Sequence, residues 1–352
     1  MVTGLKNMMQ SLFKRYIIIF ISFLNFNSLY TQKDSAESPS FEVNVNKSLM
    51  GTEIVAQAIC KNANKGKEAL YFAFKEIERI DSLYSMYGYS SIIRQINMNS
   101  GIRSTKVTWE TFSIIKRAIN YSKKYDGLFD ITIGSLTDLW GFSSDREVIV
   151  PAQSKIKSLL PLVSYKNIIL KDKDTTVFLQ KKGMMLDLGG IAKGYAVDRA
   201  CEILRKNGIN DFMLDAGGDL CVSGKNSKGE DWVIGIEHPR KKGEVIASFK
   251  CTNTCVATSG DYERFIIVKG VRYHHILLPS TGIPGRLSRS VTVIFNNTEE
   301  GTVLDKYIFL TGIKKFGKTK LAKSLKYFVV AQDGKITYSP QLKKENGLII
   351  TK

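Results

Sequence analysis

We predict an α+β fold in which mixed or antiparallel sheets pack against helices. In the first half of the chain, apolar residues recur at spacings of three and four, which is typical of amphipathic helices. Short runs rich in β-branched and aromatic residues follow, separated by turn signals such as Gly217-Gly218 and Asp333-Gly334. Because helices come early and strands mostly later, without regular alternation, we expect antiparallel sheets.

Three helices and five strands can be placed from these patterns. The helices are expected at residues 68–84, 109–125 and 194–207. Thr108 is placed to cap the second helix and Gly127 to stop it, and Gly208 ends the third. The strands are expected at residues 176–179, 212–214, 232–236, 291–295 and 327–330.

The N-terminus has the layout of a secretory signal. Lys6, Lys14 and Arg15 precede an apolar run at residues 16–24, which is shorter than the roughly 20 residues of a membrane-spanning helix. This segment contains no cysteine, so a lipid-anchored cysteine is not expected. We therefore expect a cleaved signal peptide at 1–31, a flexible leader at 32–41 and a folded domain at 42–346, exported to the periplasm or to the outer face of the cytoplasmic membrane.

The charge balance favours an anionic partner. The chain has 51 Lys and Arg against 33 Asp and Glu, a net charge of +18, which is compatible with nucleic acid, anionic lipid or a phosphorylated ligand. The basic residues are scattered, and no nucleic-acid-binding motif accompanies them, so nucleic acid is not a predicted partner. The five cysteines form no zinc-type pair, and they allow one disulfide without requiring it.

A glycine-bearing junction at residues 184–198 points to a phosphate-bearing ligand. It brings Asp187 at a strand end, the unhindered amides of Gly189 and Gly190, and Lys193 near a helix N-terminus, where anions are favoured. Taken alone, the glycines and the lysine favour a plain tight turn with a solvated lysine.

Two further stretches carry candidate site residues. The apolar side chains at 127–142 are suited to line a pocket for a flat ring, with Asp130 at its polar edge. The composition of this stretch equally allows a core strand. At 257–282, His274 and His275 are adjacent. Paired histidines serve as metal ligands, as a base and its neighbour, or as ordinary partly buried residues, and without other cues the last reading leads.

Taken in order, these stretches resemble the ApbE-type family of FAD:protein FMN transferases. The resemblance covers nearly everything after Phe41, at residues 49–52, 85–97, 127–130, 186–194, 216–219 and 258–260, with His275. It implies the flavin-transferase architecture, which is related to the T-fold. It also implies that the chain takes FAD as substrate and transfers FMN to a Thr or Ser hydroxyl of an acceptor flavoprotein, such as a subunit of a membrane redox complex, releasing AMP.

The same resemblance implies roles for individual residues. His275 is the candidate base, because a neutral imidazole accepts the hydroxyl proton near neutral pH. The expected FAD contacts are Met50, Leu128, Phe129, Asp130, Asp187, Lys193 and Leu277.

The expected Mg²⁺ site departs from the family pattern. The family holds the ion with an oxygen near the double glycine, here Gly190, and with an Asp and a Thr four residues apart. An ungapped register places Thr302 and Lys306 at those two positions, and Asp305 reaches the first only through an insertion. Because Mg²⁺ requires several hard oxygen ligands, we expect weak metal binding, with Lys306 replacing the ion. A catalytically weak FAD-binding protein and an FAD pyrophosphatase are the alternative functions.

Overall fold

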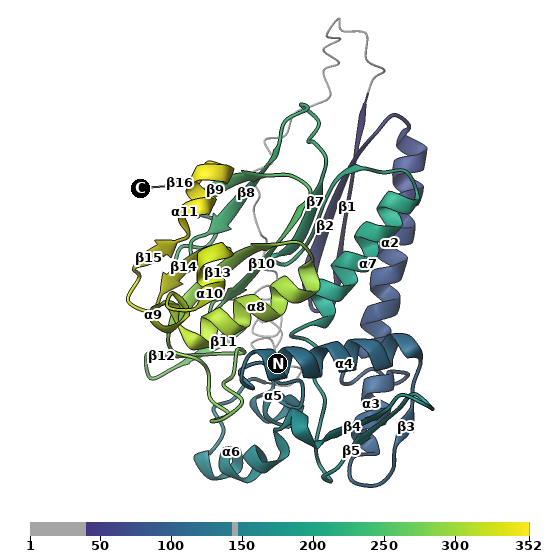
Figure 1. Cartoon of the computed structure of the whole chain (residues 1–352), viewed down its shortest axis with the longest axis vertical. Helices are drawn as coiled ribbons and strands as arrows, with labels where there is room; N and C mark the ends of the chain where they lie inside the picture. Colours follow the sequence, from purple (N-terminus) through teal and green to yellow (C-terminus); the bar gives the residue numbers. More distant parts are fainter. Residues whose placement is uncertain (1–39, 143–146, 352) are drawn as a thin grey trace, which may run out of the picture.

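The computed structural model describes residues 40–142 and 147–351, and its centre is an eight-stranded sheet (Figure 1). The strand order is β1-β2-β6-β7-β10-β13-β14-β15, and every neighbouring pair is antiparallel. The strands are β1 (Phe41–Leu49), β2 (Thr52–Cys60), β6 (Asp211–Ala216), β7 (Asp219–Ser223), β10 (Thr254–Gly260), β13 (Ser288–Phe295), β14 (Lys326–Ala331) and β15 (Ile336–Tyr338).

Three helices cover one face of this sheet: α2 (Ala63–Tyr84), α7 (Ala192–Lys206) and α8 (Thr298–Thr311). Figure 1 shows α2 and α7 side by side, with α8 next to α7. The largest cluster of buried apolar side chains lies between these helices and the sheet. The helices therefore bring the N-terminus of α7 close to α8, where several candidate site residues lie.

The opposite face is covered by a three-stranded sheet, ordered β16-β9-β8, and by α11 (Pro340–Asn346). Its strands are β8 (Trp232–Glu237), β9 (Val245–Cys251) and β16 (Ile349–Ile350). Because both faces are covered, the central strands are apolar on both sides, and every residue of β7 is buried.

The remaining helices and a second small sheet gather mainly at one end of the molecule, at the bottom of Figure 1. There lie α3 (Ile92–Met98), α4 (Trp109–Lys124), α5 (Gly134–Trp140), α6 (Gln153–Leu159), the 3-10 helices η1 (Leu160–Leu162) and η2 (Tyr165–Asn167), and the strands β3 (Thr105–Lys106), β4 (Ile168–Lys171) and β5 (Thr176–Leu179). Elsewhere lie the hairpin β11 (Phe265–Val268) and β12 (Val271–His274), and the short helices α9 (Ile313–Phe316) and α10 (Lys320–Ser324).

The predicted α+β class is confirmed, and the predicted caps explain why some boundaries agree. Helix α4 begins at Trp109 because the Thr108 hydroxyl accepts a hydrogen bond from the Thr111 N–H at 3.3 Å. Helix α7 ends at Lys206, and Gly208 follows with a φ of 78°, a conformation that favours glycine.

Among the helices that differ from the expectation, two do so for a clear physical reason. Helix α2 begins at Ala63 because the Asn62 side chain caps the N–H groups of Asn64 and Lys65 at 3.0 and 3.2 Å, and its polar first turn lacks apolar periodicity. Helix α8 was not expected at all. It packs against both the sheet and α7, so nearly all of its residues are buried and it shows little amphipathic pattern.

The predicted signal peptide, leader and domain limits can be compared with the structure only in part. The signal peptide at 1–31 and the leader up to residue 39 lie outside the described residues. The first strand starts at Phe41, and β16 pairs with β9 beyond the predicted domain limit at 346. Within residues 40–142 and 147–351, no helix combines the length and apolar character needed to cross a membrane.

The five cysteines are free thiols in the structure. Cys221 on β7 and Cys255 on β10 lie directly opposite each other, with their sulfur atoms 3.0 Å apart. The hydrogen bond between the two thiols, together with burial, raises the pKa of Cys255, so this thiol is protonated and unreactive.

The close approach of α7 to α8 predicts a loss of stability in Gly194→Ala. A Cβ atom at Gly194 would lie 2.5 Å from the Thr298 carbonyl oxygen and 2.6 Å from the Thr302 hydroxyl oxygen. We expect urea unfolding to show a free energy lower by roughly 1–3 kcal/mol, because α8 must move. The control is Gly301→Ala on α8, where the added methyl would meet only side chains, the nearest being Ala257 Cβ at 3.3 Å. Equal stability changes in the two variants would contradict this packing argument.

Candidate active site

The glycine junction is a fixed loop that leads into α7. Asn97 of α3 holds the loop from one side, because it accepts a hydrogen bond from Leu186 N at 2.7 Å and donates one to Leu186 O at 3.0 Å. On the other side, Asp187 N donates to Ile131 O at 2.7 Å. The Asp187 carboxylate accepts hydrogen bonds from Gly189 N at 2.8 Å and from the Thr137 hydroxyl at 2.9 Å. The chain therefore orders the loop itself.

Lys193, in the first turn of α7, forms an ion pair with a buried carboxylate. Its Nζ lies 2.9 Å from Asp219 Oδ2 at the start of β7, and the Asp219 side chain is only 1% exposed. Burial opposes the ammonium charge, but the Asp219 carboxylate outweighs it and raises the pKa of Lys193. Lys193 therefore stays cationic.

Lys306 brings a second ammonium group to the same loop. A Cβ atom at Gly190 would lie 3.7 Å from Lys306 Cδ and 3.0 Å from Phe129 Cε2, so Phe129, Gly190 and Lys306 are neighbours. The Lys306 Nζ donates to Thr302 O at 2.9 Å and lies 3.4 Å from Asp305 Oδ1. Asp305 is fully buried, and burial raises its pKa to about 7.

His275 lies within electrostatic reach of these cations and is a neutral imidazole. Its backbone N–H donates to Arg264 O at 3.1 Å, which fixes it beside the end of β12. Burial, followed by the charges of Arg264, His274, Lys306 and Lys193, lowers the pKa of His275 well below its ordinary value. Within the described residues its buried Nδ1 has no hydrogen-bond partner. The site thus holds an imidazole that remains unprotonated and able to accept a proton.

Arg264 ties this region to the turn between β1 and β2. Its Nη2 donates to Gly51 O at 2.9 Å and its Nη1 donates to Phe142 O at 3.4 Å. Met50, the residue before Gly51, has a φ of 53° and donates its N–H to Asp81 Oδ2 at 2.9 Å. Five separate segments of the chain therefore meet here: the β1–β2 turn, the loop before α7, the residues around Arg264, the His275 segment and α8.

Other predicted contact residues lie in supporting positions. The buried Asp130 carboxylate accepts hydrogen bonds from Thr132 N at 2.9 Å, the Thr132 hydroxyl at 2.7 Å and Tyr165 N at 2.8 Å, so it fixes its own loop. Leu128 packs partly buried on the main core, and Leu277 is buried in a small cluster with Trp140. Contact of these three residues with FAD stays a prediction.

The adjacent histidines have different environments. The His274 Nε2 lies 2.8 Å from Gly285 O, and its Nδ1 accepts a hydrogen bond from Ile276 N at 3.2 Å. His274 is therefore a satisfied core residue, whereas His275 keeps an unused ring nitrogen. This geometry does not support the reading of the pair as joint metal ligands.

The residues expected to hold Mg²⁺ do not fit that ion. The buried Thr302 hydroxyl donates to Thr298 O at 2.8 Å and packs against Gly194. Asp305 contributes a single carboxylate with an ammonium group beside it. Nowhere in the described parts of the chain do three His, Cys, Asp or Glu side chains group together to hold a metal. Mg²⁺ demands near-octahedral oxygen coordination, so we derive no catalytic step through a metal.

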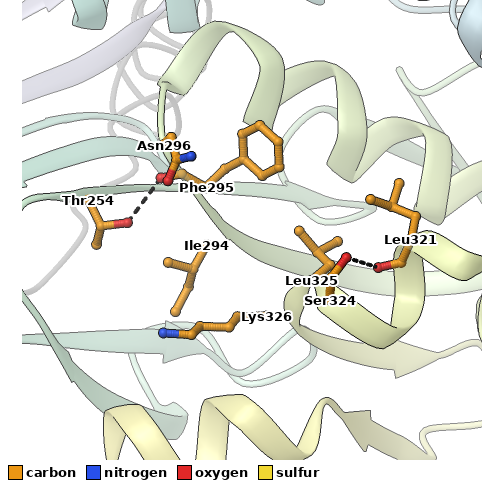
Figure 2. A pocket seen from close by; sticks show the side chains of 8 residues that line it. All are labelled: Thr254, Ile294, Phe295, Asn296, Leu321, Ser324, Leu325 and Lys326. Atoms are coloured by element: carbon orange, nitrogen blue, oxygen red, sulfur yellow. Dashed lines mark hydrogen bonds between the residues drawn. The ribbon is translucent and has the colours of Figure 1, made fainter.

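Two hollows open on the surface, and the second borders this cluster, because Glu263 and Phe265 in its lining flank Arg264. Figure 2 shows the first, of about 240 Å³, between the end of β13, α10 and β14. Its hydroxyl groups are satisfied locally, because Thr254 donates to Phe295 O at 3.0 Å and Ser324 donates to Leu321 O at 3.3 Å. The second, of about 320 Å³, is lined by residues that include Glu237, Tyr262 and Glu263. Neither groups residues suited to catalysis as the cluster around His275 does.

Sequence reasoning left out three residues that matter here. Asp219 stands in the predicted Gly-Gly-Asp motif and Arg264 in the stretch at 257–264, but neither had been assigned a role. The sequence does carry a signal for Asp219, because it is an acidic residue that directly follows two glycines at the start of an apolar strand. Thr137, which binds Asp187 from α5, carries no signal in the sequence.

Comparisons with known proteins agree with this architecture. The FAD:protein FMN transferase of Klebsiella pneumoniae is 33% identical over 246 residues, covering 69% of this chain and 75% of that protein. The FAD:protein FMN transferase of Salmonella typhimurium is 26% identical over 343 residues, covering 95% of this chain and 98% of that protein.

Solved structures give the same result. The ApbE protein of Thermotoga maritima superposes with a TM-score of 0.80 at 34% identity, covering 86% of this chain and 98% of that one. The flavin transferase ApbE of Vibrio cholerae superposes with a TM-score of 0.77 at 26% identity, covering 87% and 99%. The sequence profile of the ApbE family matches residues 50–328. The chain therefore belongs to the ApbE family.

Proposed function

We propose that this chain transfers FMN from FAD to a Thr or Ser hydroxyl of an acceptor flavoprotein and releases AMP. The observation that carries the proposal is the neutral His275 imidazole, whose pKa is lowered by burial and by the charges of Arg264, Lys306 and Lys193, together with the ordered loop at Gly189 and Gly190, which lies beside Lys306. The cations suit a pyrophosphate, and an unprotonated imidazole suits the activation of a hydroxyl. The names of the relatives support this choice of substrate.

The atoms and the proton of the transfer step are all accounted for by FAD, the acceptor hydroxyl and these side chains. The acceptor hydroxyl oxygen attacks the FMN phosphorus, its proton passes to the free ring nitrogen of His275, and the phosphoanhydride bond to AMP breaks. Lys193, Lys306 and Arg264 stabilise the charge that develops on the phosphate oxygens. Because phosphoryl transfer depends mainly on positioning and charge stabilisation, the fixed loop and the three cations account for the main requirements.

We further propose that the acceptor is an exported flavoprotein, such as a subunit of a membrane redox complex. The apolar run at residues 16–24, preceded by Lys14 and Arg15, supports export, although this segment lies outside the described residues. Cell fractionation combined with N-terminal sequencing tests this. A mature chain that begins near residue 32 and lies outside the cytoplasm is the expected result, and an intact N-terminus in the cytoplasm would contradict it.

The lowered pKa of His275 predicts how transfer depends on pH. The ratio kcat/KM for FAD reports the ionisation of the free enzyme. Because burial and the surrounding cations depress the pKa of His275 well below 6.5, the imidazole stays neutral as the pH falls through that value. We expect kcat/KM to hold steady down to well below pH 6.5, with circular dichroism confirming that the fold persists. A half-maximal value near 6.5 would contradict the proposed environment of this base.

Chromatographic analysis of AMP and FMN after incubation with FAD tests the reaction type. With an acceptor domain present, we expect AMP release without free FMN, and without acceptor we expect neither product. Free FMN in the absence of acceptor would instead identify an FAD pyrophosphatase. Tight FAD binding without AMP release in either reaction would identify a binding protein.

A further inference from the structure

The three cations around His275 differ in the hydrogen bonds and ion pairs that they already make within the chain. Lys193 is paired with the buried Asp219 carboxylate at 2.9 Å. Arg264 donates to two backbone carbonyl oxygens, those of Gly51 and Phe142. The charge of Lys193 is therefore balanced by a carboxylate, and two of the five N–H donors of Arg264 hold backbone carbonyl oxygens.

Lys306 has no carboxylate partner as close as the one that Lys193 has. An ammonium group has three N–H donors, and the one good hydrogen bond of Lys306 goes to Thr302 O at 2.9 Å. Its carboxyl neighbour, Asp305, lies at 3.4 Å, beyond the usual range for a charge-assisted hydrogen bond. Lys306 therefore keeps donor capacity for a ligand.

The position of Lys306 directs that capacity to the loop before α7. Its side chain is 18% exposed and its aliphatic part lies beside Gly190, where a side chain would stand 3.7 to 3.8 Å from its Cδ and Cε atoms. It also contributes to the positive potential that lowers the pKa of His275. The ammonium group, the loop and the imidazole thus share one small region.

We propose that the Lys306 ammonium group binds the pyrophosphate of FAD in the place of a divalent cation, so that this chain binds FAD without Mg²⁺. This inference rests on the proposed function, since FAD must be the ligand. A lysine brings one charge as a compact donor, whereas Mg²⁺ brings two and templates several oxygens. Lys193 and Arg264, close to the same imidazole, supply the remaining positive charge.

The test is a titration of the full chain with FAD, monitored by calorimetry. It is carried out once in EDTA and once in Mg²⁺. We expect the dissociation constants in the two buffers to agree within about twofold. In EDTA, Lys306→Met is expected to weaken FAD binding by at least about tenfold, the usual effect of losing a hydrogen bond to a charged group. Lys306→Arg should retain most of the affinity, and Lys314→Met, at an exposed lysine of α9, should match the parent chain.

Two readouts separate a ligand contact from a structural role. Binding of riboflavin, which has no phosphate, should be unchanged in Lys306→Met, and urea unfolding should show that the variant is folded. A second variant, Thr302→Asp combined with Lys306→Thr, restores an oxygen pair on α8, and we expect its FAD binding to become dependent on Mg²⁺.

The failures are distinguishable. FAD binding by the parent chain only in the presence of Mg²⁺ would overturn the role of Lys306 and leave the proposed function standing. Equal FAD affinity of the parent chain and Lys306→Met in EDTA would do the same. No FAD binding in either buffer would overturn both.

Discussion

The His275→Ala variant is expected to transfer FMN about 10²- to 10⁴-fold more slowly than the parent chain while binding FAD with similar affinity. The physical reason is that His275 holds a buried Nδ1 with no hydrogen-bond partner in the described chain, so removing the imidazole removes the proton acceptor without exposing another base. Single-turnover release of AMP with an acceptor domain measures the rate, and calorimetry measures the binding.

The matched control is His238→Ala. His238 lines the second hollow, where its ring accepts hydrogen bonds from the N–H groups of Arg240 and Lys241, and it is not a predicted site residue. We expect its transfer rate to equal that of the parent chain. If His275→Ala kept the parent rate, or if it lost FAD binding together with the rate, the assignment of His275 as the base would be wrong.

Lys193→Met is expected to destabilise the fold by roughly 3–5 kcal/mol, because it leaves Asp219 buried without its counter-ion. Urea unfolding measures the change. The double variant Lys193→Met with Asp219→Asn removes both charges, and it should recover most of the lost stability while FAD binding stays weak. A double variant no more stable than the single one would show that the loss comes from packing and not from the uncompensated carboxylate.

Much of the fold could be predicted where a local signal decides the structure. Thr108 placed the start of α4, and Gly208 placed the end of α7, because capping and left-handed backbone depend on single residues. The strand at 176–179 agrees with β5 for a similar reason, since its β-branched and aromatic run is short and clearly bounded. These features need no knowledge of the rest of the chain.

The features that were missed depend on tertiary structure. Helix α8 lies between the sheet and α7, and burial on nearly all sides removes the polar stripe that marks a surface helix. Pairing of β2 with β6 joins segments far apart in sequence, which no local pattern specifies.

The candidate site also combines residues that a local sequence signal identifies with residues that only the tertiary structure brings together. The loop at Asp187, Gly189 and Lys193 was identified from the sequence, because a glycine junction before a helix has a recognisable composition. The partners that hold it, Thr137 and Asp219, come from α5 and β7, and only the fold shows them. Asp130 was predicted to lie at the polar edge of a ring pocket, and only the fold shows that its carboxylate accepts hydrogen bonds from Thr132 and from the distant Tyr165.

The intact mass of an acceptor domain, measured after incubation with this chain and FAD in EDTA, tests the central claim most directly. We expect the acceptor to gain the mass of one FMN phosphoester, and fragmentation to place it on a Thr or Ser side chain. An acceptor that stays unmodified in EDTA but gains this mass when the same chain is given Mg²⁺ would contradict metal-independent transfer by this chain.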